Sequence, residues 1–190
     1  MSDTKIDEIL ETVRYLKDRQ DILDCIMREV RGRDRHDEDL TRSCYWEDGF
    51  DEHGPSIMQG PEYPARANAG HAAFFSMTTH NITSHTCEID GATANCETYV
   101  VGTLLSKDGG TCTFAPGRYI DRLEKREGEW RILHRRCTVD MSLEGSAEWV
   151  HGPAVKGFLR PTWDKDDISY KRPIAVGSDG PRWGDGDPSE

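Results

Sequence analysis

Three turn signals divide the middle of the chain into segments that have the pattern of long β-strands. Asp90-Gly91, Asp108-Gly109-Gly110 and Glu127-Gly128 mark the turns, and an Asp-Gly pair between such segments is a strong hairpin signal. Pro116-Gly117 interrupts the third segment and predicts a bulge or an edge there. Strands joined by short turns pair as an antiparallel meander, which leaves one face of the sheet for other elements to cover. The predicted strands run over residues 80–89, 94–105, 111–126 and 130–143.

The first part of the chain has helical patterns. Residues 4–34 are predicted to form a helix in two pieces, and a short helix is expected around 37–46. Residues 47–64 are rich in Gly, Pro and acidic residues and are predicted to form a loop with a short strand at 56–59. An alanine-rich helix is expected over 65–79. Helices followed by a meander of strands predict an α+β domain with its helices packed on one curved sheet.

The domain is expected to occupy residues 1–143, where the strand pattern ends. Residues 144–190 then form a C-terminal extension with little periodicity. From about Gly177 onward, Gly, Pro, Asp and Ser dominate, and disorder is expected there. Aromatic residues earlier in the extension predict that it docks in part on the domain or on a neighbouring subunit: Trp149, Phe158, Trp163, Tyr170 and Trp183.

The composition excludes several classes of function. The formal net charge of -11 argues against a general attraction to nucleic acid or to an anionic membrane. No apolar run is long enough to span a membrane and no signal-peptide core is present, so the cytoplasm is the expected location. The sequence has no Walker loop, no G-x-G-x-x-G, no G-x-S-x-G and no H-E-x-x-H. Six cysteines without a C-x-x-C pair predict reduced, mostly buried thiols.

Asp34 continues an aliphatic stripe on the predicted helix. Ile22, Ile26, Val30 and Asp34 follow one another at steps of four residues, so all of them project from one helix face. The three aliphatic residues predict a core contact, and the stripe directs Asp34 toward a place where water is scarce. A carboxylate in that setting either finds a partner or has its pKa raised. Both outcomes suit an enzyme that transfers protons.

Four segments carry a resemblance to a known family. RGRDRHDEDL (31–40), THNITSHTCEIDG (79–91), CETYV (96–100) and GRYIDRLEKREGEWRILHRR (117–136) resemble the SnoaL-like branch of the nuclear transport factor 2-like (NTF2-like) superfamily. The resemblance covers roughly residues 5–143, and the last strand pair is its most specific part. It implies a cone-shaped, cystatin-like α+β fold, in which three N-terminal helices pack on a strongly curved antiparallel sheet around one deep pocket.

The resemblance also implies a catalytic pair. Scytalone dehydratase-like, bile-acid dehydratase-like and hexachlorocyclohexane dehydrochlorinase-like members use an Asp–His dyad without metal or organic cofactor, and the matching residues here are Asp34 and His80. Tyrosines near the dyad assist the leaving group in such enzymes, which makes Tyr45 a candidate for substrate binding. From the residues alone, Asp34 is better explained as a helix-end carboxylate paired with the neighbouring arginines, which are Arg31, Arg33 and Arg35; the resemblance favours the dyad.

The register of the first hairpin adds a further candidate. With Asp90-Gly91 as a two-residue loop, Ile82 faces Tyr99 and His80 faces Val101, so Tyr99 is predicted on the sheet face of His80. A phenol at that position would donate a hydrogen bond to a substrate oxygen. The alternative is that Tyr99 packs in the core with its hydroxyl satisfied.

The register of the last hairpin predicts two further candidates. With Glu127-Gly128 as a two-residue loop, Tyr119 faces Arg136 and Asp121 faces His134, on the more apolar and therefore inner face. Tyr119 and Arg136 are therefore predicted to bind substrate, because an arginine there would stabilise developing negative charge. The alternative places the arginines of this strand in a salt-bridge network at a subunit interface.

No metal site is expected. His85 lies five residues from His80, so a regular strand would turn the two side chains to opposite faces. The sequence also lacks a compact spacing of carboxylates and histidines.

The leading prediction is a cofactor-independent lyase for a small, apolar, ring-containing molecule such as a steroid, a polyketide or a lignin-derived aromatic. His80 takes the proton and Asp34 orients His80, while water, a hydrogen halide or, by C–C cleavage, formaldehyde departs. The alternatives are an isomerase or cyclase on the same scaffold and a non-catalytic ligand-binding module. The resemblance also implies a homo-oligomer, either a trimer or a dimer.

Overall fold

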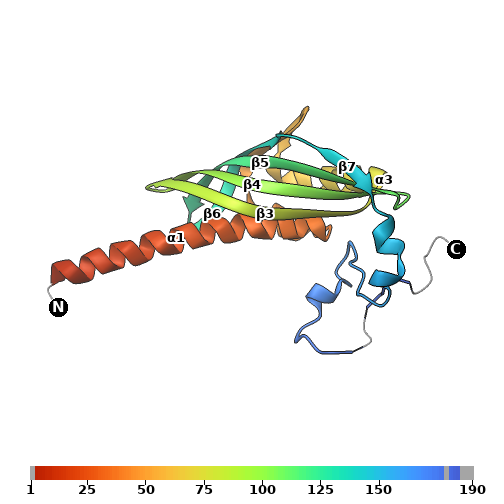
Figure 1. The fold of residues 1–190 in the computed structure, drawn as a ribbon. Coiled ribbons are helices and arrows are strands. Elements are labelled where there is room, and N and C mark those ends of the chain that lie inside the picture. Colours follow the sequence, from red (N-terminus) through yellow and green to blue (C-terminus); the bar gives the residue numbers. More distant parts are fainter. Residues whose placement is uncertain (1–2, 178–179, 185–190) are drawn as a thin grey trace.

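The protein is an α+β domain in which helices cover one face of a curved sheet (Figure 1). The computed structural model describes residues 3–177 and 180–184, and within this part a seven-stranded sheet has the order β2-β1-β6-β5-β4-β3, with β7 also paired to β5. The helices are α1 (Asp3–Asp34), α2 (Glu38–Arg42) and α3 (Tyr63–Phe74). The strands are β1 (Tyr45–His53), β2 (Ser56–Gln59), β3 (Phe75–Asp90), β4 (Thr93–Ser106), β5 (Thr111–Arg126), β6 (Glu129–Val139) and β7 (Leu143–Ser146). The predicted fold class is confirmed.

Helix α1 is one continuous helix of 32 residues rather than two pieces. No Gly or Pro occurs in it before Gly32, so nothing breaks it earlier. Its second half packs into the core through Ile22, Cys25 and Ile26, which have no exposed surface. Among the described residues, no helix has the length and apolarity needed to cross a membrane.

The end of α1 is shaped by a close approach of α2. A Cβ atom on Gly32 would lie 2.3 Å from Oγ1 and 2.8 Å from the backbone nitrogen of Thr41. The chain then turns through His36, which has a φ of 48°, and the backbone N–H of Asp37 donates to the carbonyl of Gly32 at 2.8 Å. Gly32, which has a low helix propensity, therefore allows the turn that places Asp34 at the helix terminus.

Strand β1 lies where a helix and a loop were predicted. It pairs in parallel with β6 and antiparallel with β2, so the sheet is mixed rather than purely antiparallel. Its acidic composition concealed it, because strands ordinarily exclude Asp and Glu. Asp51 is nevertheless buried and accepts hydrogen bonds inside the domain. Tyr45, predicted on a helix, is the first residue of this strand.

The register of the first hairpin differs from the prediction. The turn consists of residues 91 and 92, and a bulge lies between Ile82 and His85. As a result His80 pairs with Gly102 and Ile82 with Val100. Tyr99 points to the outer face, where it is 46% exposed, so its predicted position beside His80 is wrong.

A bulge also changes the last hairpin. Leu123 pairs with Ile132, as the two-residue loop requires, but beyond the bulge Tyr119 pairs with Cys137 and Asp121 with Arg135. Tyr119 and Asp121 are buried as expected, whereas Arg135, and not Arg136, is the arginine of β6 that points into the domain. The side chain of Arg136 is 70% exposed and pairs with Glu52.

The C-terminal extension begins later than predicted, because β7 continues the sheet to Ser146. Three short 3-10 helices follow in the described part: η2 (Glu148–His151), η3 (Pro153–Val155) and η4 (Ile168–Tyr170). Disorder was predicted after Gly177; within residues 180–184, Trp183 exchanges backbone hydrogen bonds of 2.9 Å with Gly157 and Phe158. Residues 178–179 and 185–190, for which disorder was also predicted, lie outside the described residues.

Candidate active site

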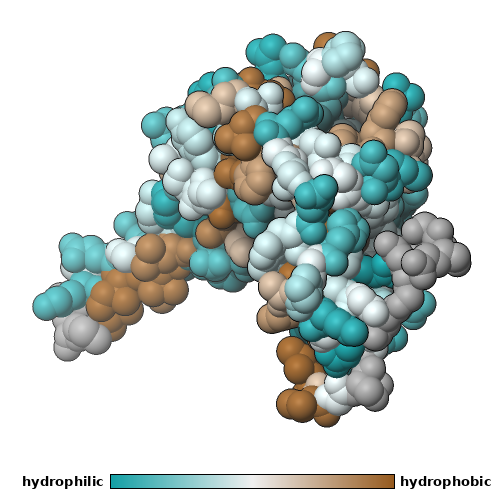
Figure 2. Space-filling view, turned by 45° about the vertical axis from the view of Figure 1, so that its right-hand side comes forward, coloured by the Kyte–Doolittle hydropathy of each residue, from teal (hydrophilic) through white to brown (hydrophobic). Residues whose placement is uncertain are grey.

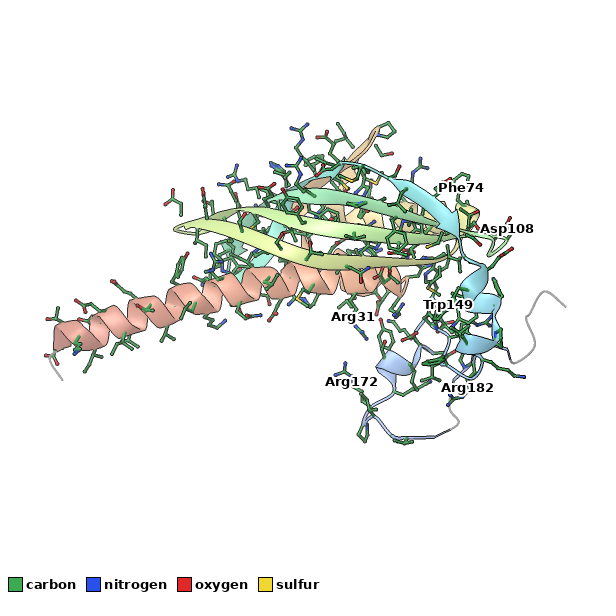
Figure 3. The ribbon with its side chains drawn as sticks, viewed as in Figure 1. Arg31, Phe74, Asp108, Trp149, Arg172 and Arg182 are labelled. Atoms are coloured by element: carbon green, nitrogen blue, oxygen red, sulfur yellow. The ribbon has the colours of Figure 1, made fainter. Side chains whose placement is uncertain are left out.

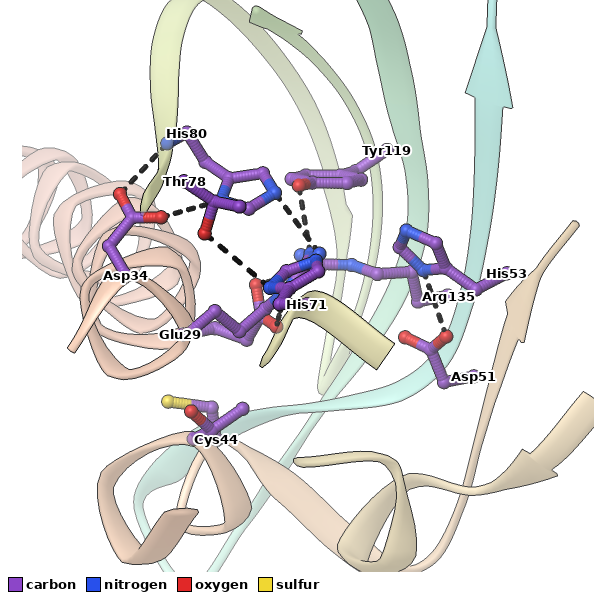
Figure 4. A network of polar contacts seen from close by, with 12 residues as sticks. Glu29, Asp34, Cys44, Asp51, His53, His71, Thr78, His80, Tyr119 and Arg135 are labelled. Atoms are coloured by element: carbon purple, nitrogen blue, oxygen red, sulfur yellow. Dashed lines mark hydrogen bonds and ion pairs between the residues drawn. The ribbon is translucent and has the colours of Figure 1, made fainter. Parts of the chain in front are cut away.

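Asp34 and His80 are joined by two hydrogen bonds (Figure 4). Asp34 Oδ1 lies 2.6 Å from His80 Nδ1, and Asp34 Oδ2 accepts the backbone N–H of His80 at 2.8 Å. The side chains are only 14% and 8% exposed, respectively. With the carboxylate as the acceptor of a hydrogen bond from Nδ1–H, the lone pair of the neutral ring lies on Nε2. The structure thus brings together the two residues predicted as a dyad.

Burial shifts both members of the pair toward their neutral forms. It raises the pKa of the Asp34 carboxyl to about 7, against the opposing effect of the hydrogen bond from the His80 backbone. Burial, together with the positive charge of Arg33, lowers the pKa of His80 well below its ordinary value. Near neutral pH the imidazole is therefore uncharged, which is the form that accepts a proton.

The lone pair of His80 meets an arginine on the inner side of the sheet. Arg33 Nη2 lies 3.1 Å from His80 Nε2, and Arg33 Nη1 donates to the hydroxyl of Tyr119 at 3.0 Å. Arg33 is 2% exposed and lies over the ring of Tyr63. Burial opposes its charge, but the nearby oxygens of Tyr119, Tyr63 and Glu29 hold the pKa of Arg33 well above its ordinary value. Arg33 therefore links the proposed base to Tyr119.

A buried network of ion pairs supports this arrangement. Arg135 donates to Asp121 at 2.8 and 2.7 Å and to Glu29 at 2.5 Å, with all three side chains fully buried. Its guanidinium lies 4.0 Å from the centre of the Tyr119 ring. Glu29 also approaches Arg33, with 3.8 Å between Oε1 and Nε. These contacts hold Arg33 and Tyr119 in position.

Aromatic rings form another wall of the interior. His53 stacks on Tyr63 with 5.1 Å between ring centres, and its Nδ1 lies 3.2 Å from Asp51, which also accepts the hydroxyl of Tyr45 at 2.7 Å. The buried hydroxyl of Tyr63 has no hydrogen-bond partner within the described protein. The interior thus combines apolar ring surfaces with one buried hydroxyl that has no partner among the described residues.

A series of rings leads from the dyad to the C-terminal extension. His71 stacks on His80 at 5.8 Å, His36 lies 6.3 Å from His71, and Trp163 stacks on His36 at 4.2 Å. Burial lowers the pKa of His71 to about 3, so this ring is neutral beside His80. The extension therefore contributes a side chain to the surroundings of the site.

Polar contacts anchor the extension beside Asp34. Tyr170 donates to Asp37 at 3.0 Å and lies under the guanidinium of Arg31, and Arg35 pairs with the buried Asp167 at 3.3 Å. Figure 3 shows Arg31 at the end of α1, directed toward the extension.

Two cavities flank the edge strand β3. A cavity of about 520 Å³ opens at the dyad and is lined by Met27, Val30, Asp34 and His80, together with charged residues of α1. A larger cavity of about 840 Å³ lies between the sheet and the extension, and its walls include Trp149, Trp163 and Trp183. Thr79 lines the larger cavity and the next residue, His80, lines the smaller one, so the strand separates them.

One group in the described residues has the donor types of a metal site. Ligand atoms of His85, Cys87 and Cys96 lie within 4.8 Å of one another. The bulge after Ile82 brings His85 near these inner-face thiols, contrary to the predicted orientation of its side chain. Thr98 lies 2.8 Å from His85 Nδ1, which leaves Nε2 as the possible ligand atom.

The remaining predicted residues have different positions. Tyr119 reaches the dyad through Arg33, and Tyr45 is buried but bonded to Asp51. Tyr99 and Arg136 lie on the outer face and touch neither member of the dyad. The sequence interpretation missed Arg33, which it treated only as a possible partner for Asp34. A signal was present, since Glu29 and Arg33 lie four residues apart and continue the stripe of Ile22 and Ile26 by steps of three and four.

A curved sheet with helices on one face and a buried Asp–His pair at the end of the first helix defines the class to which this chain belongs. A model of the SnoaL-like domain matches residues 14–136. The chain is a member of the SnoaL-like family, within the NTF2-like superfamily. No curated protein sequence matches it.

Solved structures show the same fold. A scytalone dehydratase-like protein of Novosphingobium aromaticivorans is 18% identical with a TM-score of 0.63, covering 70% of this chain and 90% of its own. Hexachlorocyclohexane dehydrochlorinase LinA-type3 of Novosphingobium barchaimii is 19% identical with a TM-score of 0.65, covering 70% and 94%. Rv3472 of Mycobacterium tuberculosis, a protein of unknown function, is 27% identical with a TM-score of 0.60, covering 68% and 75%. All three comparisons leave about a third of this chain unmatched.

Proposed function

We propose that this protein is a cofactor-independent lyase in which His80 removes a proton from a small ring-containing substrate. The observation that carries the proposal is the Asp34–His80 pair, whose two hydrogen bonds fix the ring and leave Nε2 as the base. Two of the structural relatives have names that denote elimination, a dehydratase and a dehydrochlorinase. The fold alone does not determine the reaction, so the proposal depends on the residues around the base.

Each group near the base has a role in this proposal. Nε2 of His80 accepts the proton from a substrate carbon, and Asp34 stabilises the imidazolium that forms. The electrons of the C–H bond form a double bond while the leaving group departs with its bonding pair. Arg33 and Tyr119, which already bind each other at 3.0 Å, hold the departing or enolate oxygen. The imidazolium then returns its proton to the leaving group, so that no cofactor is consumed.

Arg33 has to exchange one contact for another during this cycle. Without substrate its guanidinium lies against the lone pair of Nε2. A substrate oxygen is a better partner for a charged donor than a neutral imidazole is. Binding of that oxygen therefore draws Arg33 away from Nε2 and frees the base. This requirement favours a substrate that carries at least one oxygen function on an otherwise apolar ring.

The proposal extends to the substrate class and the leaving group. Rings of His53, Tyr63, His71 and Tyr119 suit a steroid, a polyketide or a lignin-derived aromatic. Water or a hydrogen halide leaves by this elimination. Formaldehyde would leave by C–C cleavage instead: His80 takes the O–H proton of a hydroxymethyl group, the O–H electrons form the C=O bond of formaldehyde, and the C–C electron pair stays on the substrate carbon, which then takes the proton back from the imidazolium. An isomerase or cyclase would use the same base but retain every substrate atom.

The test is a comparison of product formation by wild type, His80→Ala and His134→Ala. The panel contains hydroxylated and halogenated ring compounds of these classes, and mass spectrometry measures whether atoms are lost. His134 lies exposed on the outer face and is the matched control. The expected result is a loss of roughly 10²–10⁴-fold in rate for His80→Ala and no loss for His134→Ala. Full activity in His80→Ala would refute the role of the base, and a product of unchanged mass would indicate an isomerase.

A further inference from the structure

The first half of α1 projects from the domain as an arm, defined here as residues 3–17 (Figure 1). Every residue of the arm is exposed. Contact with the domain begins at Asp18, which accepts hydrogen bonds from Lys125 at 2.6 Å and Trp130 at 2.9 Å. A helix of this length without tertiary contacts is only marginally stable in water. The arm therefore requires a partner surface to remain helical.

The arm carries an apolar stripe with the spacing of a coiled coil. Ile6, Ile9, Val13 and Leu16 follow at steps of three, four and three residues, which are the a and d positions of two heptads. They are 40%, 47%, 55% and 58% exposed. Figure 2 shows hydrophobic side chains gathered along the projecting helix. A stripe of this kind fits another helix with the same spacing.

We propose that the occupant is a second copy of this chain, with the two arms paired antiparallel about a two-fold axis. In this pairing Ile6 of one copy faces Leu16 of the other, and Ile9 faces Val13, so that the contact is self-complementary. The arm is about 21 Å long at 1.5 Å per residue. Asp3 then lies opposite Arg19 of the partner copy, where the partner's domain begins, so the arms overlap along their whole length without collision of the domains.

Charges along one flank of the stripe support this direction. The flanking e positions are Asp3, Leu10 and Lys17. Antiparallel pairing places Asp3 beside Lys17 of the partner copy at both ends and Leu10 beside Leu10 in the middle. Parallel pairing would place Lys17 beside Thr12 and would form neither ion pair. Arg19 lies on the other flank of the stripe. Its side chain is directed to its own domain, where it donates to the carbonyl of Cys87 at 2.9 Å, and is therefore not directed to the partner arm.

The first experiment measures the oligomeric state of the full chain by sedimentation velocity at micromolar concentration. Wild type and Tyr15→Glu are expected to be dimers, because Tyr15 is exposed on the arm but outside the stripe. Val13→Glu adds the same charge inside the stripe, twice per dimer, and is expected to weaken the dimer by roughly 100-fold or more. Circular dichroism and thermal unfolding of the domain show whether each variant remains folded. A monomeric wild type, or an assembly that Val13→Glu leaves unchanged, overturns the proposal.

A second experiment tests the direction of pairing. Leu10→Cys is expected to form an intermolecular disulfide readily under mild oxidation, since the two copies of residue 10 face each other only in the antiparallel arrangement. Thr4→Cys is the control, because residue 4 lies on the outer side of the arm and far from its equivalent in the partner copy. Efficient cross-linking through Thr4→Cys but not through Leu10→Cys would exclude antiparallel pairing.

Discussion

The carboxylate of Asp34 holds His80 at two points, the ring nitrogen Nδ1 at 2.6 Å and the backbone nitrogen at 2.8 Å. The first contact sets which ring nitrogen carries the proton. The second fixes the first half of β3 against the end of α1. Orientation of the base and orientation of the strand therefore depend on one side chain.

Asp34→Asn should reduce activity more than the loss of a single hydrogen bond would suggest. The backbone N–H of His80 requires an oxygen acceptor, so the NH₂ group of the introduced amide would turn toward Nδ1 and donate to it. That contact puts the ring proton on Nε2 and removes the lone pair that accepts the substrate proton. A decrease in kcat of roughly 10²–10⁴-fold is expected, with KM changed little. Asp7→Asn, on the exposed arm, is the control, and an Asp34→Asn enzyme with near wild-type kcat would contradict the assigned tautomer.

Asp34 and His80 should change the free energy of unfolding with pH in opposite directions. Burial raises the pKa of Asp34 from 3.8 to about 7, so its contribution to stability is present at low pH and is lost as pH rises through this interval. His80 acts with the opposite sign, because its lowered pKa gives a contribution that is lost as pH falls below its ordinary value of 6.5. Between about pH 4 and 6.5 the two contributions largely cancel in the wild type.

Asp34→Asn separates these contributions. In the variant only the His80 contribution remains, whereas in wild type the two contributions largely cancel. As pH falls below 6.5, the free energy of unfolding of the variant should therefore fall, relative to that of wild type, by up to about 1.4 kcal/mol per pH unit. Urea unfolding at pH 7, 6 and 5 measures the difference. A constant difference across this range would show that the pKa of Asp34 is not raised in the folded protein.

The α+β class could be predicted from the order of the helical and strand patterns, whereas the pairing of Asp34 with His80 was predicted from the family resemblance and not from the residues alone. The sequence interpretation failed where strands bulge. The extra residue in β6 lies at Leu133, so Arg135 points inward and Arg136 outward, although Tyr119 on the regular strand β5 was placed correctly. A shift of one residue reverses the faces of everything beyond it. Neither this bulge nor the one after Ile82 contains Gly or Pro to signal it.

Gly32→Ala should destabilise the fold and disturb the dyad. The added Cβ would meet the backbone nitrogen of Thr41 at 2.8 Å, and this backbone atom cannot move without displacing α2. A cost of about 1–3 kcal/mol is expected, with reduced activity, since Asp34 lies two residues further along the same turn. Gly70→Ala is the matched control, because a Cβ there meets nothing within 4 Å and α3 should gain up to about 1 kcal/mol. Chemical unfolding of both variants checks this, and equal stabilities would refute the close contact with Thr41.

Arg135 and Arg136 are neighbours in sequence but should respond very differently to substitution by methionine. Arg135→Met leaves Asp121 buried without its partner and leaves Glu29 with only the more distant Arg33, a loss that typically costs about 3–5 kcal/mol. Arg136→Met removes an exposed pair with Glu52 and should leave stability unchanged. Burial already raises the pKa of Asp121, and loss of the Arg135 charge raises it further, so this carboxyl binds its proton more tightly in the folded variant. The deficit of Arg135→Met should therefore be smaller at pH 5 than at pH 7, as measured by urea unfolding. A deficit that is the same at both pH values, or equal for the two arginines, would show that the Arg135 network is not a buried ionic one.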